Sequence, residues 1–355
     1  MKALFLLTVM MTAFSCSAPH ASSPDDLLRD LTKDAGPGGA LAVIKDGQLV
    51  YSASFGWAVE GVPITDETNF RLASVTKQFT ATAVMMLVER GRVGLEQPLS
   101  EFFAELAPAI RRITVHQLLT HTSGIVAYED LIPDTATVPV LDRDVLELVA
   151  PVDSTYFAPG TAYRYSNTGY AILALIVQQV SGRSFAEFLQ TEIFSPLGMS
   201  STVAFEKGIS TVRNRAYGHS PDPDHPGTFL KTDQSMTSSV LGDGGIYSSI
   251  RDLLRWDQGL RQGSVLSSSA LRQMLSPYTP IDEDNRWYGL GWYLALAGTD
   301  TISYHGGSTV GFRTCILRVP SRSSAVIALF NRSDAQAEDI AWKLAEHFGL
   351  ITAPR

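Results

Sequence analysis

Apolar and polar residues alternate near both ends of the chain in the manner of β-strands. The segment 39–55 alternates on either side of Asp46-Gly47, a dipeptide that favours a tight hairpin turn. Four short apolar runs near the other end have the pattern of strands, and they lie at 289–295, 301–305, 312–319 and 325–330. The pattern therefore predicts a sheet to which both ends of the chain contribute.

The segments between these strands indicate helices. The clearest helix spans 75–90 and ends at Gly91; it is apolar on nearly every side, so we expect it to be buried at the centre of the fold. Other helices are expected at 171–180, 185–194, 250–259 and, near the end of the chain, 335–348.

Together these elements predict an α/β (α+β) fold in two parts. A mainly antiparallel sheet flanked by helices is expected from 22–95 and 278–355, with a mainly helical domain, 96–277, inserted between them. A length of 355 residues suits such a two-part molecule better than a single core. We expect the functional site in the groove between the parts, where ligand sites commonly lie.

The first residues, 1–21, have the features of a signal peptide. A basic start at Met1-Lys2 precedes an apolar run, 3–14, that is too short to span a bilayer. Cleavage after Ala18 would leave a soluble protein, whereas cleavage before Cys16 would leave a lipid-anchored one. Both alternatives predict export to the periplasm or cell envelope, with membrane contact only through the anchor at Cys16.

Composition narrows the range of partners. The chain is 45% hydrophobic and 18% charged, carries a net charge of −8 and has no long basic run, so we expect a globular enzyme that does not bind nucleic acid. Its seven histidines are scattered and no phosphate-binding glycine motif follows a strand, so we expect neither a metal nor another cofactor. Cys315 lies in an apolar run and is expected to be a buried structural thiol.

The first chemical signal is Ser74-Val75-Thr76-Lys77 at the start of the strong helix. Residues three apart share a helix face, so the Lys77 amine can approach the Ser74 hydroxyl, and the positive helix N-terminus favours an anion there. A desolvated lysine near other cations can act as a base. The alternative is a helix-capping serine followed by a solvated lysine, because this short motif arises often by chance.

The second signal is Tyr165-Ser166-Asn167, which we place on a loop before the helix at Ala171. A phenol aimed at the nucleophile can pass a proton to the leaving group if nearby cations lower its pKa. The Asn167 amide can hold both Lys77 and a substrate carbonyl. The alternative is a surface tyrosine followed by a helix-capping asparagine.

The third signal is His305-Gly306-Gly307-Ser308, at the end of a predicted strand. Two glycines allow a substrate backbone to lie close beside that strand. The backbone N–H groups of Ser74 and Ser308 can then face one oxygen as an oxyanion hole, and His305 can orient or protonate the substrate.

In this order, the three motifs resemble the serine β-lactamase-like family, which includes penicillin-binding proteins, class C β-lactamases, D-Ala-D-Ala carboxypeptidases, D-aminopeptidases and related esterases. The resemblance covers roughly 38–331 and extends to three connecting segments, 118–124, 196–199 and 244–248. It implies that Ser74 is the nucleophile, Lys77 its base, Tyr165 the catalytic tyrosine and Asn167 the amide that positions the substrate.

The third motif departs from the pattern of β-lactamases and carboxypeptidases, which usually have Lys-Thr-Gly. Here His305 stands where those enzymes have a permanent positive charge, and histidine is charged only partly at neutral pH. The histidine form resembles the D-aminopeptidase and esterase branches, so rapid turnover of β-lactams is in doubt.

The sequence thus predicts a metal-free serine hydrolase that forms an acyl-enzyme on an amide or ester bond. A D-peptide, an ester and a β-lactam all remain open as the substrate, with a cell-wall-derived molecule among them. The segments 126–139 and 217–236 are expected to form the walls that select it. A second hypothesis is a non-catalytic module that binds peptidoglycan or a β-lactam.

Overall fold

The computed structural model describes residues 24–32, 35–282 and 285–351. The predicted signal peptide, 1–21, and Cys16 lie outside these ranges, so export and lipidation stay predictions. Within the described ranges, no helix has both the length and the apolar character needed to cross a membrane.

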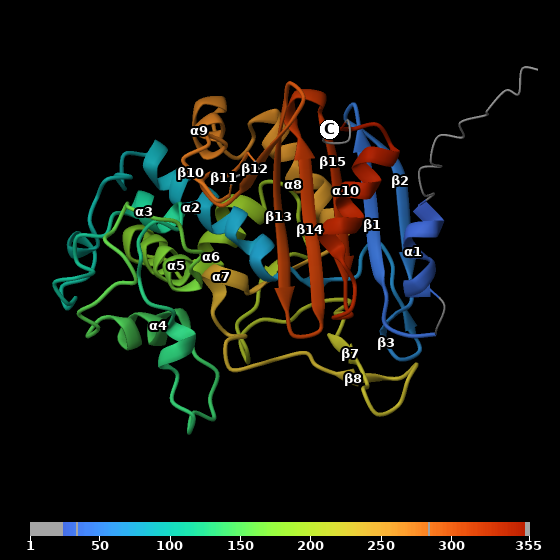
Figure 1. Cartoon of the computed structure of the whole chain (residues 1–355), viewed down its shortest axis with the longest axis horizontal. Helices are drawn as coiled ribbons and strands as arrows, with labels where there is room; N and C mark the ends of the chain where they lie inside the picture. The colour runs from blue at the N-terminus through green and yellow to red at the C-terminus, as the bar shows by residue number, and fades with distance from the viewer. Residues whose placement is uncertain (1–23, 33–34, 283–284, 352–355) are drawn as a thin grey trace, which may run out of the picture.

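An eight-stranded antiparallel sheet forms one side of the molecule (Figure 1). Its strands follow the order β10-β11-β12-β13-β14-β15-β1-β2, so strands from both ends of the chain are joined, which confirms the predicted fold class. The strands are β1 (Gly39–Lys45), β2 (Gln48–Phe55), β10 (Thr279–Pro280), β11 (Arg286–Tyr288), β12 (Tyr293–Ala297), β13 (Asp300–Thr309), β14 (Phe312–Val319) and β15 (Ser324–Phe330).

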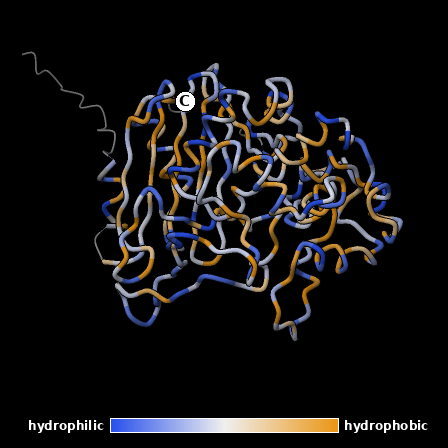
Figure 2. The backbone as a smooth tube through the Cα atoms, turned by 180° about the vertical axis from the view of Figure 1, so that it is seen from behind, coloured by the Kyte–Doolittle hydropathy of each residue, from blue (hydrophilic) through white to orange (hydrophobic). Residues whose placement is uncertain are grey.

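Strands β1 and β15 are buried on both faces, which explains why both are apolar along most of their length. All seven residues of β15 are buried, with alternate side chains in two separate cores. Helices α10 (Ala337–His347) and α1 (Pro24–Thr32) cover one face, and α8 (Ile250–Gln262) packs on the other. In Figure 2, orange hydrophobic stretches run along strands of this sheet. Cys315 is fully buried in the core beneath α10, as predicted.

The β1–β2 hairpin turns at Asp46-Gly47, as predicted. Both residues have positive φ values, 51° and 78°, which suit a two-residue turn between twisted strands.

Most of the remaining helices lie between β2 and β10. They are α2 (Thr76–Glu89), α3 (Val115–Leu119), α4 (Asp142–Val149), α5 (Asn167–Ser181), α6 (Phe185–Leu189) followed by a π-helical turn (Gln190–Phe194), α7 (Leu241–Gly244) and α9 (Ser268–Met274). Short strands supplement them: β3 (Trp57–Val59), β4 (Val62–Pro63), β5 (Phe70–Arg71), β6 (Val203–Ala204), β7 (His219–Pro221), β8 (Phe229–Lys231) and β9 (Ile246–Ser248).

Helix α2 lies at the centre, where the sheet meets the helical part (Figure 1). Every residue from Thr76 to Leu87 is buried, which confirms the expectation of a buried helix. The Phe79 ring stacks on Trp256 of α8 with centroids 4.2 Å apart, so α2 is fixed against the helix behind the sheet. A rigid α2 provides a firm support for the residues at its first turn.

Two details differ from the sequence prediction. The predicted strand 289–295 is broken by a turn between β11 and β12, where Gly291 has a φ of 80°. A Cβ at Gly291 would lie 2.8 Å from the Lys77 carbonyl oxygen, so this glycine packs against α2 instead of continuing a strand. Asn167, predicted to lie on a loop, is the first residue of α5, and Ser166 caps that helix by accepting a hydrogen bond from the Gly169 amide.

Candidate active site

The Ser74 nucleophile predicted from the sequence lies in a 3₁₀ turn, Ala73–Val75, that leads into α2. Ala73 has a φ of 49°, a left-handed conformation that a residue with a Cβ adopts at an energetic cost. The turn is held from the strand side, because the Thr314 hydroxyl donates to the Leu72 carbonyl at 2.7 Å. The Ser74 side chain does not cap the helix; it faces the Lys77 amine instead.

Lys77 is fully buried and makes three hydrogen bonds through Nζ. It donates to Asn167 Oδ1 at 2.8 Å, to the Asp243 carbonyl at 2.9 Å and to Ser74 Oγ at 3.2 Å. A neutral lysine amine has two N–H groups and one lone pair. The two shorter bonds can keep the N–H groups, which leaves the lone pair facing the Ser74 hydroxyl.

Burial lowers the pKa of Lys77 to about 8. The negative charges of Asp243 and Glu129 oppose this effect and keep the pKa from falling further. The amine therefore exchanges its proton close to physiological pH, which is what a general base requires.

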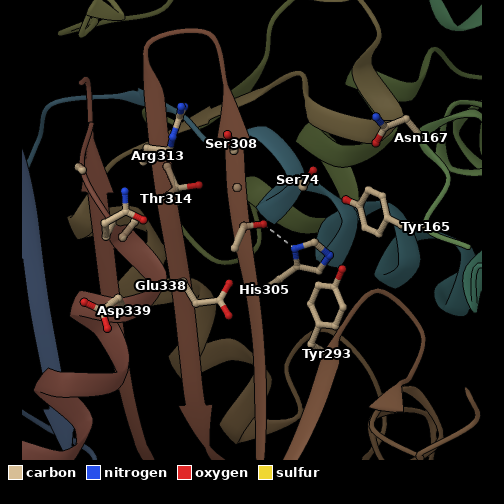
Figure 3. A pocket seen from close by; sticks show the side chains of 15 residues that line it. Ser74, Tyr165, Asn167, Tyr293, His305, Ser308, Arg313, Thr314, Glu338 and Asp339 are labelled. Carbon is tan, nitrogen blue, oxygen red and sulfur yellow. Dashed lines mark hydrogen bonds between the residues drawn. The ribbon is translucent and has the colours of Figure 1, made fainter. Parts of the chain in front are cut away.

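Figure 3 shows the hydroxyl of Tyr165 directed toward Ser74. Lys77 Nζ lies 4.9 Å from the centroid of the Tyr165 ring. A lowered pKa, which the role predicted for Tyr165 from the sequence required, is not found. Burial raises the pKa of Tyr165 well above that of a free phenol, although the neighbouring Ser74 hydroxyl acts in the opposite direction. Tyr165 is thus a neutral phenol that has a proton to give.

The segment that carries Tyr165 is held in place by His121. The Ser166 backbone N–H donates to His121 Nδ1 at 3.1 Å, and the His121 ring lies 4.4 Å from that of Tyr165. Burial and the nearby Lys77 lower the pKa of His121 well below its usual value, so its Nδ1 remains an acceptor. This histidine therefore supports the backbone of the segment that carries Tyr165.

Asn167 links the base to a carboxylate. Its Oδ1 accepts from Lys77, and its Nδ2 donates to Glu129 Oε1 at 2.8 Å. These two bonds fix the orientation of the amide beside Ser74.

His305 lies on β13 and is fully buried in a neutral state. Its Nδ1 is 2.7 Å from the Gly306 carbonyl, and because a carbonyl only accepts, Nδ1 must be the protonated nitrogen. Its Nε2 then accepts from the Tyr288 hydroxyl at 3.0 Å. Burial and the nearby Lys77 lower the pKa of His305 to about 3. Both ring nitrogens are engaged, so the geometry suits an orienting role and not the donation of a proton.

The two glycines after His305 allow β13 to approach the nucleophile closely. A Cβ at Gly307 would lie 2.3 Å from the Leu72 carbonyl oxygen and 2.3 Å from the Thr314 hydroxyl, so no other residue fits there. This close approach places Ser308 and Ser74 at the walls of the same two cavities. The oxyanion hole formed by their backbone N–H groups stays a prediction.

Two cavities meet at Ser74. A larger one, of about 550 Å³, has Tyr165, His305 and Gly306 in its wall and extends to the start of α10 (Figure 3). A smaller one, of about 140 Å³, is lined by polar groups that include Arg71, Tyr128 and Asp243. The nucleophile therefore stands where two separate parts of a substrate can lie.

Sequence reasoning missed two acidic residues near Lys77. Asp243 is buried in α7, and its side chain accepts from the Tyr128 hydroxyl at 3.3 Å. Burial raises the pKa of Asp243 to about 6, although Lys77 opposes this. Glu129 reaches the site through Asn167. Each is a single carboxylate in a helical segment of only four residues, and only the position of Glu129 within the predicted wall 126–139 gave a hint.

The second predicted wall, 217–236, lies elsewhere. None of its residues lines either cavity at Ser74. Its β7–β8 hairpin instead packs near the lower edge of the sheet, where the His219 ring lies 4.8 Å from that of Trp57 (Figure 1). Among residues 24–32, 35–282 and 285–351, no three acidic, histidine or cysteine side chains gather as a metal site would require.

The chain is similar in sequence to penicillin-binding proteins and D-aminopeptidases. It is 31% identical over 326 residues to penicillin-binding protein 4* of Bacillus subtilis, covering 87% of this chain and 71% of the relative. It is also 31% identical to a D-aminopeptidase of Brucella anthropi over 87% of this chain. This chain spans only 58% of that enzyme's length.

The fold has close counterparts among solved structures. The octameric penicillin-binding protein homologue from Pyrococcus abyssi superposes with a TM-score of 0.80 at 28% identity, over 91% of this chain and 75% of that one. The family model described as Beta-lactamase matches residues 25–349. Nearly all of the described chain is thus covered by one model, and the protein belongs to the beta-lactamase family.

Proposed function

We propose that this chain hydrolyses an amide or ester bond through an acyl-enzyme on Ser74, and that its preferred acyl group is a D-aminoacyl group. The observation that carries the proposal is the cluster of Ser74, Lys77 and Tyr165, in which a fully buried amine hydrogen-bonds the serine and a phenol is directed toward it. This cluster offers the nucleophile both a base and an acid.

Acylation begins when Ser74 Oγ attacks the substrate carbonyl and its proton passes to the neutral amine of Lys77. The oxyanion that forms accepts from the backbone N–H groups of Ser74 and Ser308. The carbon–nitrogen bond then breaks as the Tyr165 phenol gives its proton to the leaving amine, and Lys77 returns a proton to Tyr165. The ester on Ser74 and a free amine are the products of this half-reaction.

Deacylation repeats these steps with water as the nucleophile. Lys77 in its neutral form accepts a proton, through Tyr165, as water attacks the ester carbonyl, and Ser74 Oγ recovers a proton when the acid leaves. A base with a pKa of about 8 is partly neutral at physiological pH, so both half-reactions can use the same amine.

The charges around Ser74 favour an aminoacyl group over a carboxylate-bearing substrate. His305 is neutral, so the third motif offers no counter-ion for the carboxylate of a β-lactam or of a D-Ala terminus. The small cavity instead has the Asp243 side chain in its wall, with Glu129 one hydrogen bond beyond Asn167. These carboxylates suit the ammonium group of a small amino acid. The D configuration rests on the D-aminopeptidase relatives.

The alternative of a non-catalytic binding module predicts that at least one reactive group is missing or displaced. Ser74, Lys77 and Tyr165 are all present; Lys77 hydrogen-bonds Ser74, and the Tyr165 hydroxyl is directed toward it. This arrangement favours the enzyme.

The test compares the full-length protein with Ser74→Ala on three substrates: a p-nitrophenyl ester, a D-alanyl anilide with its L-alanyl counterpart, and a chromogenic cephalosporin. We expect hydrolysis of the ester and of the D-anilide in preference to the L-anilide, little hydrolysis of the cephalosporin, and loss of activity in the variant. Equal inertness of both proteins on every substrate would support the binding module.

We also propose that the protein is exported, on the basis of the signal-like residues 1–21 alone. Expression of the full chain with and without Cys16→Ala tests this. A shift of the protein from the membrane to the soluble envelope fraction in the variant would indicate lipidation. Retention of the uncleaved chain in the cytoplasm would contradict export.

A further inference from the structure

The two cavities at Ser74 divide the substrate between them. Ser74, Asn167 and Ser308 line both cavities, whereas Tyr165 lines only the larger one. Because Tyr165 is the group that protonates the leaving amine, the leaving group must lie in the larger cavity. The acyl group is then left for the smaller, polar one.

The larger cavity passes over the free edge of β13 to the face that α10 covers. Gly306 pairs with Cys315 and Ser308 pairs with Arg313, so these residues share the face of the sheet on which Cys315 is buried beneath α10. Strand β12 pairs with β13 only as far as Tyr304, which leaves the edge open from His305 onward. A leaving group can therefore extend across Gly306 toward α10.

Glu338, in the first turn of α10, lies directly at this crossing. A Cβ placed on Gly306 would come within 2.7 Å of Glu338 Oε2, so the absence of a side chain at 306 leaves the carboxylate in the cavity wall. Figure 3 shows the carboxylate beside the strand, between Asp339 and His305. A leaving group that extends across Gly306 thus meets this carboxylate.

Glu338 makes no ion pair with another side chain in the described part of the chain, whereas its neighbour Asp339 is paired with Lys343 at 2.7 Å. Partial burial raises the pKa of Glu338, and the nearby positive charge of Arg286 opposes this only in part. A cation in the cavity would stabilise the carboxylate further.

Neither His305 nor Arg313, which also line the cavity, neutralises Glu338. His305 is neutral. Arg313 directs Nη1 to the carbonyl oxygens of Val310 and Phe312, in the turn after β13. Within the described part of the chain, Arg313 forms no ion pair with Glu338, although both residues line the cavity.

We propose that Glu338 is a specificity-determining residue that receives a positive charge on the leaving group. The preferred substrates are then D-aminoacyl amides whose amine leaving group carries a second, cationic group, as a basic amino acid does. The inference rests on the proposed hydrolase function and specifies the leaving group of that same site.

The test uses D-alanyl-lysinamide and D-alanyl-norleucinamide, which have leaving groups of similar length and differ in one positive charge. We expect kcat/KM to be about tenfold higher for the lysinamide at low ionic strength, and the ratio to decrease as salt is added. In Glu338→Gln the ratio should fall to about one or two. The matched control is Asp339→Asn, one residue away, which loses the same charge from an existing ion pair and should keep the ratio.

A second readout makes the test independent of amide turnover. Lysinamide and norleucinamide are products of the reaction and should inhibit hydrolysis of the p-nitrophenyl ester, lysinamide the more strongly, and Glu338→Gln should abolish the difference. A ratio near one in the unmodified protein by both readouts, or a ratio that survives in Glu338→Gln, would overturn the inference. If Ser74→Ala hydrolyses the ester as well as the unmodified protein does, the proposed function fails instead.

Discussion

Two buried basic side chains flank Ser74, and they respond to burial in different ways. Lys77 on α2 and His305 on β13 are both withdrawn from water, yet the pKa of Lys77 is about 8 and that of His305 about 3. Asp243 and Glu129 stabilise the charged form of Lys77 and so raise its pKa. His305 gains no such support from a carboxylate, and the positive charge of Lys77 lowers the pKa of His305 further. Burial lowers both pKa values, and most of the difference between them is already present in the free side chains, whose pKa values are 10.5 for lysine and 6.5 for histidine. The neighbouring carboxylates widen this difference by keeping the pKa of Lys77 from falling further.

The largest effect should come from removing the base. Lys77→Ala leaves Ser74 without a proton acceptor, so we expect kcat/KM for the p-nitrophenyl ester to fall about 10³–10⁴-fold. Circular dichroism and the thermal unfolding midpoint of the variant check that the protein is still folded. A folded variant with more than a tenth of the original activity would show that the base lies elsewhere.

The next-largest effect should come from removing the proposed acid, Tyr165. Tyr165→Phe removes the proton that the leaving amine needs, so we expect kcat/KM for the D-alanyl anilide to fall at least about 10²-fold. A p-nitrophenolate leaves without a proton, so hydrolysis of the ester should fall much less. Equal losses on both substrates would contradict the role of Tyr165 as the acid for the leaving group.

A smaller effect is expected from a substitution of His305 on β13. His305→Asn replaces a neutral donor and acceptor by another, so kcat/KM for the ester should fall less than about tenfold. Steady-state kinetics with the ester measure this directly. A loss comparable with that of Lys77→Ala would mean that His305 transfers protons after all.

The smallest effect is a shift in pH dependence. Asp243→Asn removes a negative charge that raises the pKa of Lys77, so the acid limb of kcat/KM should move to lower pH by about one unit or less. Tyr128→Phe is the matched control, because it removes the hydrogen bond to Asp243 without removing the charge. A limb that stays in place in Asp243→Asn, or moves to higher pH, would contradict the electrostatic account.

Much of the fold could be predicted because local patterns and tertiary packing agree. The Asp46-Gly47 dipeptide favours a tight turn by itself, and the fold has a hairpin there. The apolar run of β15 favours a buried strand, and the fold covers that strand on both faces. The strand predicted through Gly291 was wrong because the constraint there is tertiary: the backbone must pass close to the Lys77 carbonyl.

The sequence indicated which residues gather around Ser74, but it did not predict the electrostatic effects among them. The spacing of Ser74 and Lys77 on one helix fixes their contact locally. The pKa of Tyr165, by contrast, depends on how much water the whole fold excludes. The contribution of Asp243 depends on a turn far away in sequence, so no spacing rule could identify it.

The pH dependence of kcat/KM for the p-nitrophenyl ester, measured for the unmodified protein and for His305→Asn, tests the central claim most directly. The account predicts a single rise in kcat/KM with an apparent pKa of about 8 in both proteins, since the neutral form of Lys77 is the active one and accumulates as pH rises through its pKa. A rise with an apparent pKa between about 6 and 7 that disappears in His305→Asn would contradict it, because His305 would then be the titrating base.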